Sequence, residues 1–502
     1  MDKFAVTCKA HSGYSKCMGN TRTTKDTAAG SDVQDHGPFS STAPTWQEDR
    51  YNAGVAARQT LPPESLATYT PNPKRDPLGI LAQQNQSRVP DLVPLRMTRM
   101  LQDRFAFFRG AAALMAADMY YEPISGGRVF VCGDAHINNF GVYATPEGRL
   151  VFDVNDFDES TIGPWEWDIK RTVTSVVLAS QLRGDDKKIA EQDALECVRA
   201  YRDSLQVHME RYVQDRFFRP TKAQKKERPG PKTPQERVGI ALSNTIKTAK
   251  KRTSLRAAEK MTQLTSDGRR VIVPAPPVLV PLVKEDYQYV QPAFEAYIAQ
   301  MPSNVQLLMS EFKLTDMARR VVGVGSVGTR CYVGVYTGPD GEPFVLQLKQ
   351  AVLSALVQYG KQAIPDNPIL VPERTVETPG YRVTTCQRAL QEVSDPFLGD
   401  IQIDGYGFYV RQFRDESAGV DVTTLKPKEY TDYVRSCGAQ LGRAHIRSQD
   451  GAFAAGYMGK DDEATNALAS WGAAYAEQSV QDWEALKAAA AAGKFPTMKT
   501  SE

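Results

Sequence analysis

The sequence is poor in histidine, has no long apolar run and carries no excess of charge of either sign. Five histidines and seven scattered cysteines, none of them in a C-x-x-C pair, are too few for a structural zinc site. No segment approaches the ~18 uninterrupted apolar residues of a membrane helix, so we expect no membrane span. Lys and Arg outnumber Asp and Glu by only 61 to 59. This balance predicts no general affinity for nucleic acid.

The cysteines and the first residues together indicate a compartment. The opening stretch MDKFAVTCKAHSGYSKC has no apolar core of the kind that a secretory signal needs. An odd number of cysteines without a paired pattern fits free thiols under reducing conditions. We therefore expect a cytoplasmic protein.

The length of 502 residues exceeds what one ordinary hydrophobic core organises, so we expect two or three packed units. Residues 1–65 are rich in Ser, Thr, Gly, Asp and Pro without periodicity, which predicts a disordered tail. A helical lobe is expected over 66–318, a β-rich lobe over 319–415 and C-terminal helices over 416–502. This mixture predicts an α+β fold.

Local sequence patterns predict the helices and strands within these lobes. Apolar residues spaced by three and four predict helix over 92–121, and helix is expected for most of 167–315. The basic segment 216–232 contains Pro and Gly and is interpreted as an exposed connector, with contact to a phosphate-rich substrate as the alternative. Strands are predicted at RVFVCGD and GRLVFDVND, and in the β-rich lobe at YRVTTCQRALQ and GYGFYVRQFRD.

Asp134, Asn139 and Asp156 form the first group of candidate site residues. In CGDAHINNFGVYATPEGRLVFDVNDFDE, a predicted strand–turn–strand separates the first two from Asp156. Phosphoryl transfer needs a carboxylate that orients the attacking hydroxyl and oxygen ligands that hold Mg²⁺ on the phosphates. Asp134 suits the first role, and Asn139 and Asp156 suit the second. We expect Asp158 near the metal and Asp153 to be structural, whereas the alternative is that all are ordinary turn residues.

The same segment resembles the catalytic core of aminoglycoside and choline phosphotransferases, which share the arrangement of protein kinases. Those enzymes show H-G-D-x-H-x-x-N followed by I-D-[FW]. The matching residues here are Gly133, Asp134, His136 and Asn139. Cys132 replaces the first histidine. The resemblance implies a catalytic role for His136, and it implies that Asp168 holds the loop through backbone hydrogen bonds.

A second group lies in VVGVGSVGTRCYVGV and in the strand after it. Gly323, Gly325 and Gly328 form G-x-G-x-x-G, and with Ser326 they are candidate nucleotide-binding residues. A Rossmann turn is the alternative, but these glycines lead into a strand and not a helix. FVLQLK then puts Lys349 on the next strand. There it resembles the kinase lysine that contacts the α- and β-phosphates, with an exposed edge lysine as the alternative.

The order of the two groups is reversed relative to an ordinary kinase, because the glycine segment follows the Asp134 segment. A circularly permuted, protein-kinase-like two-lobed fold accounts for this order, with a hinge near 406–415 leading back to the large lobe. The helix that ends in LGRAHIRSQD resembles the phosphotransferase helix that normally ends just before the catalytic loop. A domain-swapped dimer satisfies the same order, so the sequence leaves the oligomeric state open.

Motifs across most of the chain resemble the DUF2252 family. They are RMTRMLQDRFAFFRGAA, CGDAHINNFG, FDVNDFDE, VVGVGSVGT, YVRQFRD and GRAHIRS, in this order, and they cover about residues 85–490. The resemblance supports the fold and the site more than any substrate. Arg109 in the first motif is a phosphate ligand or half of a structural ion pair. Gln350, Cys386 and Glu416 depart from the family pattern, which keeps a loss of activity open.

The sequence therefore predicts an ATP- and Mg²⁺-dependent phosphotransferase that acts on a hydroxyl of a small-molecule acceptor more readily than on a protein. The acceptor classes are sugars, aminocyclitols and other small alcohols. A catalytically inactive kinase-like module that binds nucleotide is the alternative, and nucleotide binding without turnover would distinguish it. A metallophosphoesterase, suggested by G-D-x-H alone, needs more clustered histidines than this chain has.

Overall fold

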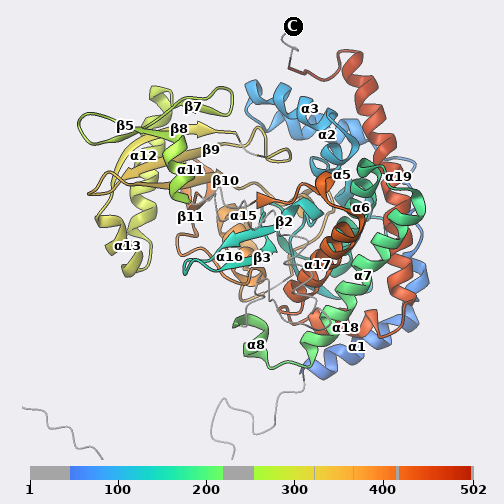
Figure 1. The fold of residues 1–502 in the computed structure, drawn as a ribbon. Coiled ribbons are helices and arrows are strands. Elements are labelled where there is room, and N and C mark those ends of the chain that lie inside the picture. The colour runs from blue at the N-terminus through green and yellow to red at the C-terminus, as the bar shows by residue number, and fades with distance from the viewer. Residues whose placement is uncertain (1–45, 219–253, 322, 366, 414–417, 499–502) are drawn as a thin grey trace, which may run out of the picture. The chain divides into compact units, whose positions relative to one another are not determined.

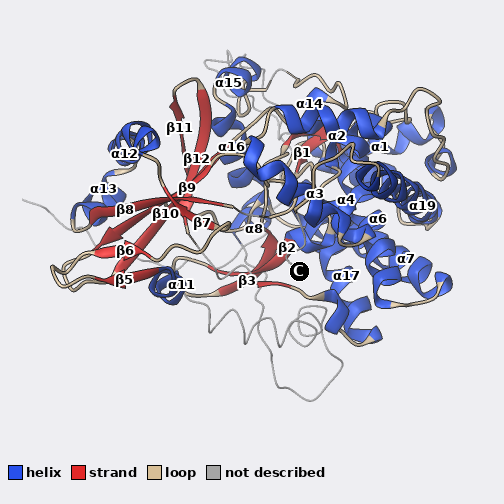
Figure 2. Ribbon diagram, turned by 90° about the horizontal axis from the view of Figure 1, so that it is seen from above, coloured by secondary structure: helices blue, strands red, loops and turns tan. Residues whose placement is uncertain are grey.

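The computed structural model describes residues 46–218, 254–321, 323–365, 367–413 and 418–498 (Figure 1). These described residues form one compact unit. Helices and strands are both abundant in it, so the predicted α+β class is confirmed (Figure 2). Among the described helices, none combines the length and the apolar character needed to cross a bilayer.

A helical body collects segments from both ends of the chain. Its helices are α1 (Trp46–Thr60), α2 (Pro77–Gln86), α3 (Val93–Leu101), α4 (Arg104–Arg109), α5 (Ala112–Met119), α6 (Trp165–Arg183), α7 (Lys187–Met209), α8 (Val213–Phe218), α17 (Pro427–His445), α18 (Gly451–Met458) and α19 (Glu463–Ala491). Short 3-10 turns join them: η1 (Pro63–Leu66), η2 (Pro90–Leu92) and η4 (Val422–Thr424). At the centre, α6 is buried on all sides from Trp165 to Ser180 and packs against α7 and α19. A helix enclosed in this way fixes the direction of every side chain that it carries.

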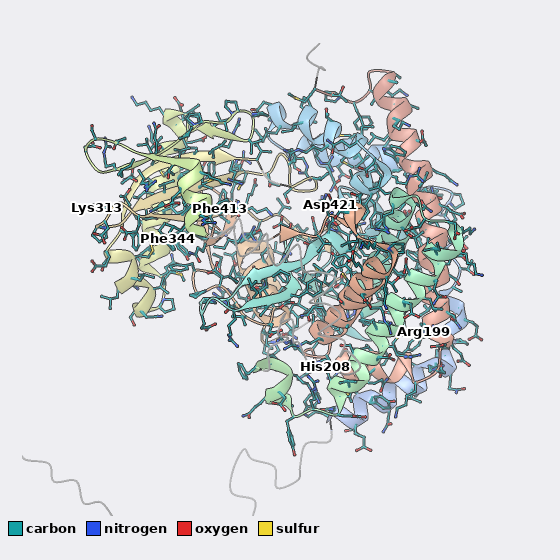
Figure 3. The ribbon with its side chains drawn as sticks, viewed as in Figure 1. Arg199, His208, Lys313, Phe344, Phe413 and Asp421 are labelled. Carbon is teal, nitrogen blue, oxygen red and sulfur yellow. The ribbon has the colours of Figure 1, made fainter. Side chains whose placement is uncertain are left out.

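A six-stranded antiparallel sheet follows the order β11-β12-β10-β9-β8-β7. Its strands are β7 (Leu279–Pro281), β8 (Lys313–Arg320), β9 (Cys331–Thr337), β10 (Pro343–Gln350), β11 (Gly399–Ile403) and β12 (Tyr406–Gln412). One face is covered by α12 (Lys284–Ala299) and α13 (Ser303–Ser310), and the other is approached by α11 (Ser254–Met261). Phe344 packs against the apolar residues on the α12 side of the sheet and Phe413 packs with those on the α11 side; both are labelled in Figure 3.

Strand β9 shows why the sequence pattern there is apolar throughout. Tyr332 and Tyr336 pack on the α12 side, whereas Val333 and Val335 pack on the opposite side. Successive side chains of a strand point to opposite faces, so a strand covered on both faces needs apolar residues at every position. On β10, Lys349 shares a face with Val345, which lies in the α11-side cluster.

Smaller sheets build the part of the chain that was predicted as strand–turn–strand. β2 (Phe140–Ala144) pairs with β3 (Leu150–Val154), and β13 (Ala418–Gly419) pairs with β2. β1 (Arg128–Val131) pairs instead with β4 (Thr161–Pro164), while β5 (Thr262–Leu264) pairs with β6 (Arg270–Ile272). The hairpin between Asn139 and Asp156 is therefore present, with the 3-10 turn η3 (Ile137–Asn139) just ahead of it.

Two predictions about secondary structure are wrong. The segment 381–391 is not a strand but the second part of helix α16 (Pro379–Leu390). Its β-branched residues suggested a strand, yet the buried Val383, Cys386 and Leu390 recur at helical spacing and contact the main core. Residues 46–60 are helix α1, which packs on α18, so the disordered tail predicted for 1–65 is wrong there. Residues 1–45 lie outside the described part.

The lobe boundaries also differ from the expectation. The sheet already begins with β7 and β8, ahead of the boundary expected at residue 319, and the segment 167–315 contains β5 to β8 as well as helices. After β10 the chain leaves the sheet for α14 (Ala355–Gln358), α15 (Pro372–Glu377) and α16, which contribute to the main core. It then returns to the sheet with β11 and β12. Most of the basic segment 216–232, Glu416 and the end of the hinge expected near 406–415 lie outside the described residues.

Candidate functional site

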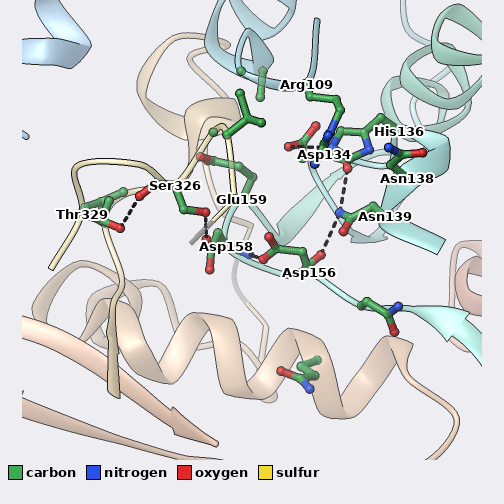
Figure 4. Close-up of a pocket in the computed structure, with 18 of the residues that line it drawn as sticks. Arg109, Asp134, His136, Asn138, Asn139, Asp156, Asp158, Glu159, Ser326 and Thr329 are labelled. Carbon is green, nitrogen blue, oxygen red and sulfur yellow. Dashed lines mark hydrogen bonds and ion pairs between the residues drawn. The ribbon is translucent and has the colours of Figure 1, made fainter. Parts of the chain in front are cut away.

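A cavity of about 290 Å³ is lined by residues of the helical body and of the segments around the six-stranded sheet (Figure 4). The predicted site residues that line it are Asp134, His136, Asn139, Asp156, Asp158, Gly323, Gly325 and Ser326. Lys349 is buried behind this lining and contacts two of its carboxylates. Gly328 does not line the cavity and packs against Arg88. The fold thus brings together segments that are far apart in the sequence.

The loop ahead of Asp134 is held by helix α6. The carboxylate of Asp168 accepts hydrogen bonds from the N–H groups of Cys132 at 2.6 Å and Gly133 at 2.9 Å. His445, at the end of α17, lies 3.2 Å from the same carboxylate. Gly133 has a φ of 77°, and a Cβ there would overlap the carbonyl oxygen of Glu159, so only glycine fits. The backbone hydrogen bonds expected of Asp168 are confirmed.

Asp134 is paired with an arginine that the sequence analysis did not single out. Nε of Arg171 donates to Oδ1 of Asp134 at 2.7 Å, and Arg171 also donates to the carbonyl oxygen of Phe108 at 2.8 Å. The guanidinium lies 4.0 Å from the centre of the Phe108 ring. Burial raises the pKa of Asp134, and the attraction of Arg171 offsets only part of that rise. Asp134 is therefore a carboxylate with an elevated pKa in a fixed position.

His136 lies next to this carboxylate. Its Nε2 is 3.8 Å from Oδ2 of Asp134, and its Nδ1 is buried without a hydrogen-bond partner. Burial lowers the pKa of His136 well below 6.5, so the imidazole is neutral at pH 7. A neutral imidazole in this position has one N–H donor and one acceptor nitrogen with which to hold a hydroxyl next to Asp134.

Asn139 ties the two ends of the β2–β3 hairpin together. Its amide nitrogen donates to the carbonyl oxygens of Asp134 at 2.9 Å and Asp156 at 3.2 Å (Figure 4). The amide oxygen is then the atom with which Asn139 would bind a cation. The side chain of Asp156 is 42% exposed. Partial burial and the neighbouring charge of Asp158 raise its pKa.

Asp158 is the most heavily bonded carboxylate of the cavity. Nζ of Lys349 lies 2.5 Å from its Oδ2, whereas Oδ1 of Asp156 is 3.7 Å from the same ammonium. Tyr409 donates to Oδ1 of Asp158 at 2.7 Å, and Ser326 donates to Oδ2 at 2.9 Å. Burial alone would raise the pKa of Asp158, but Lys349 and these hydrogen bonds outweigh it and lower the pKa. Asp156 is consequently the freer of the two carboxylates.

The glycine loop, residues 323–328, is docked on the N-terminal helices. Val327 is fully buried in a cluster with Leu92. The N–H of Val89 donates to the carbonyl oxygen of Gly328 at 2.8 Å, and the Arg88 guanidinium donates to the carbonyl oxygen of Val327. Gly328 has a φ of 94°, and a Cβ there would press on the Arg88 side chain. Contacts with Arg88, Val89 and Leu92 therefore hold the loop against the N-terminal helices. Ser326, on the other side, donates to the carboxylate of Asp158.

The sequence analysis did not identify several residues of the site, and for one of them, Arg171, the sequence contains a pattern that predicts its position. Arg171 follows Asp168 by one helical turn, so both point toward the same loop, and that spacing was readable. Tyr409 stands opposite Lys349 in the β10–β12 register. Arg88 and Glu159 also line the cavity. Strand register and the docking of distant helices have no local signal in a single sequence.

The residues present fit a hard divalent cation held jointly with phosphates. Within the described residues, no group of three or more His, Cys, Asp and Glu side chains is arranged as a metal site. Mg²⁺ ordinarily binds one or two carboxylates and takes its other ligands from phosphates and water. Asp156, with the amide oxygen of Asn139, supplies such a set, and Asp158 would first have to release a donor.

The family model described as "Uncharacterized protein conserved in bacteria (DUF2252)" matches residues 88–489. No curated protein and no solved structure matches the chain. The matched region contains the loop that carries Asp134, the hairpin that ends at Asp156, the glycine loop and Lys349. The chain therefore belongs to the DUF2252 family.

Proposed function

We propose that this protein is an ATP- and Mg²⁺-dependent phosphotransferase that acts on a hydroxyl of a small-molecule acceptor. One observation carries the proposal. The Asp134–Asn139–Asp156 segment and the glycine loop line one cavity, and Lys349 reaches the carboxylates of that cavity from the sheet. A phosphotransferase needs these parts together, because positioning and charge neutralisation supply most of its rate enhancement.

Asp134, Asn139, Asp156 and Lys349 each have a role in this proposal. Asp134, kept in place by Arg171, orients the acceptor hydroxyl and accepts its proton. Asn139 and Asp156 hold Mg²⁺, which neutralises charge on the phosphates when it is bound. Lys349 and the backbone N–H groups of the glycine loop hold the nucleotide phosphates. The cytoplasm is the compartment in which we place this activity, consistent with the buried free thiols of the described cysteines.

The order of elements supports a permuted kinase-like arrangement. The glycine loop joins β8 to β9, the lysine lies on β10, helix α16 follows, and β11 and β12 complete the set. This is the order of the nucleotide lobe of kinases, placed here after the Asp134 loop. Helix α16 offers Gln387 and Gln391 to the cavity where kinases use a glutamate, and Asp158 pairs with the lysine instead.

That substitution favours a second candidate function. A module in which Lys349 stays bound to Asp158 would hold nucleotide without transferring phosphate. Turnover separates the two candidates. Asp134→Asn should lower the rate of ATP hydrolysis by about 10²–10⁴-fold in an active enzyme, because it removes a general base while leaving the nucleotide contacts in place. In the inactive module, wild type and variant both bind nucleotide and neither hydrolyses it.

The proposal is tested by thermal unfolding with ATP, with and without Mg²⁺. Ligand that binds only the folded protein raises the melting temperature according to its affinity. We expect a Mg²⁺-dependent rise in wild type, a much smaller rise in Asp156→Asn, and a wild-type rise in Asp267→Asn, an exposed carboxylate on the β5–β6 turn. No rise in wild type with any nucleotide and metal would overturn the proposal.

A further inference from the structure

Three arginines line the cavity, Arg88, Arg109 and Arg411, and none of them forms an ion pair with a described residue. Arg411 donates to the side-chain oxygen of Gln347, whereas Arg88 and Arg109 have no side-chain acceptor in the described part of the chain. Among the described residues, the side chain of Arg109 makes no hydrogen bond and no ion pair, and its Nε is buried without a partner. Within the described part of the chain, the Arg88 guanidinium donates only to the carbonyl oxygen of Val327, and its Nε is also buried without a partner. Arg171 and Arg75 behave differently, because their guanidinium groups are bound by carboxylates.

Arg88 and Arg109 lie beside the chemistry of the proposed site. Figure 4 shows the side chain of Arg109 next to Asp134 and His136. The glycine loop passes close to the end of α4, since a Cβ on Gly325 would lie 3.3 Å from the carbonyl oxygen of Arg109. Arg88 is joined to the same loop through Val327. Both arginines thus line the cavity that the glycine loop also lines, Arg88 with its guanidinium bonded to that loop and Arg109 with its backbone next to it.

No carboxylate of the cavity neutralises them. Asp134 and Asp156 attract Arg109 from a distance but form no ion pair with it, and Asp134 is already paired with Arg171. Glu159 is the strongest attraction on Arg88, yet burial raises the pKa of Glu159 to about 7, so it carries only part of a charge at neutral pH. Burial lowers the pKa of Arg88 to about 10, which leaves the guanidinium protonated.

An uncompensated guanidinium inside a protein is costly, and a bound anion removes that cost. The planar fork of N–H donors on arginine matches the oxygens of phosphate, and such pairs are among the strong charge-assisted hydrogen bonds. A cationic acceptor such as an aminocyclitol would meet repulsion at this position. The unpartnered groups of Arg88 and Arg109 are therefore donors that suit a phosphate dianion.

We propose that Arg88 and Arg109 form a phosphate-binding subsite between Asp134 and the glycine loop. The source of the dianion rests on the proposed phosphotransferase function. In that enzyme it is either the terminal phosphoryl group of the nucleotide or a phosphate on the acceptor. Both sources share the same chemistry. Because Arg88 also holds Val327, a dianion in the subsite is connected to the glycine loop by one side chain.

The subsite is tested by calorimetric titration of inorganic phosphate into the full-length protein. Wild type should bind phosphate, and Arg88→Gln and Arg109→Gln should each weaken binding at least tenfold. Arg104→Gln is the matched control, because Arg104 lies on the same helix as Arg109 and contacts Gln181 outside the cavity. It should bind as wild type does. Absence of phosphate binding by wild type, or equal affinity in all four proteins, would overturn the subsite.

A conservative variant keeps the test decisive if a glutamine variant misfolds. Arg109→Lys retains the positive charge but loses the fork of donors, so it should bind phosphate with an affinity between those of wild type and Arg109→Gln. Its melting temperature without ligand reports whether it is folded. A folded Arg109→Lys that binds phosphate as tightly as wild type contradicts the bidentate role assigned to Arg109.

Repeating the titration with saturating Mg²⁺ and the non-hydrolysable ATP analogue AMP-PNP separates the two sources. If phosphate still binds and still depends on both arginines, the subsite belongs to the acceptor. If the analogue abolishes phosphate binding, the subsite holds the terminal phosphoryl group. Arginine-dependent phosphate binding in a protein that shows no stabilisation by ATP would keep the subsite and reject the phosphotransferase proposal.

Discussion

The cavity contains two carboxylate–cation pairs that are built differently. Arg171 lies on α6, and Asp134 lies on the loop after β1 that Asp168 of the same helix holds. Arg171 is fixed further by the carbonyl oxygen and the ring of Phe108. Asp158 and Lys349 join the end of the hairpin segment to strand β10, and Asp158 also receives Ser326 from the glycine loop. The first pair joins α6 to the loop that α6 itself holds, whereas the second joins the hairpin segment to the six-stranded sheet.

In the proposed phosphotransferase, the two pairs have different tasks. A buried pair with additional bonds on its cation holds a side chain in one geometry, which is what a residue that orients a hydroxyl needs. A pair that joins separate parts can exchange partners when a ligand enters. Nucleotide phosphates would attract Lys349, and a cation would attract Asp156 and Asp158. We therefore expect loss of the first pair to reduce stability most and loss of the second to reduce ligand binding most.

The largest effect on stability should come from Arg171→Met. The change leaves Asp134 buried without its partner, and breaking a buried pair from one side costs about 3–5 kcal/mol. Lys349→Met should cost less, about 2 kcal/mol, because Asp158 keeps the Tyr409 and Ser326 hydrogen bonds. Urea unfolding of both variants measures the two free energies. Equal losses would remove the distinction between the pairs.

A smaller effect is expected at the glycine loop that Asp158 contacts. Gly328→Ala should lower the free energy of unfolding by about 1–3 kcal/mol, because an αL backbone strains alanine and its Cβ meets Arg88. Gly268→Ala is the matched control, since Gly268 has a φ of 80° and open space around it. The difference between the two variants reports the contact with Arg88. Identical losses would mean that the docking of the loop adds nothing.

The smallest effect should be a pH dependence that arises from Glu159. Burial raises the pKa of Glu159 from 4.5 to about 7, so between these values the folded protein binds more protons than the unfolded chain. The contribution of Glu159 to stability is therefore present below pH 4.5 and is lost as the pH rises toward 7. Glu159→Gln should flatten this decline. Unfolding free energies at pH 5 and pH 8 test it, and an unchanged slope in the variant would contradict the assignment.

Short-range sequence patterns predicted several of the residues that line the cavity. Residue types and spacing around Asp134, Asn139 and Asp156 predicted the loop and the hairpin, because both depend on neighbours in the chain. The same reasoning failed at 381–391, where β-branched residues outweighed the helical recurrence of Val383, Cys386 and Leu390. The predicted lobe boundary at residue 319 was wrong because β7 and β8, which belong to the six-stranded sheet, lie before it in a stretch that is largely helical.

Long-range pairings could not be predicted from the sequence. No sequence pattern near Lys349 indicates that Asp158 is its partner, because that contact depends on how the sheet packs against the hairpin segment. The support of the glycine loop by Arg88 and Val89 likewise depends on the packing of α2 and α3. Such contacts are decided by packing across the whole unit and leave no local periodicity to detect.

The most direct test of the account is calorimetric titration of Mg²⁺–AMP-PNP into wild type and Lys349→Met. We predict one equivalent of binding to wild type and at least tenfold weaker binding to the variant, a difference of about 1.4 kcal/mol or more. That result would identify the cavity beside the Asp158–Lys349 pair as a nucleotide site. No binding to wild type, or equal affinity in the two proteins, would contradict it.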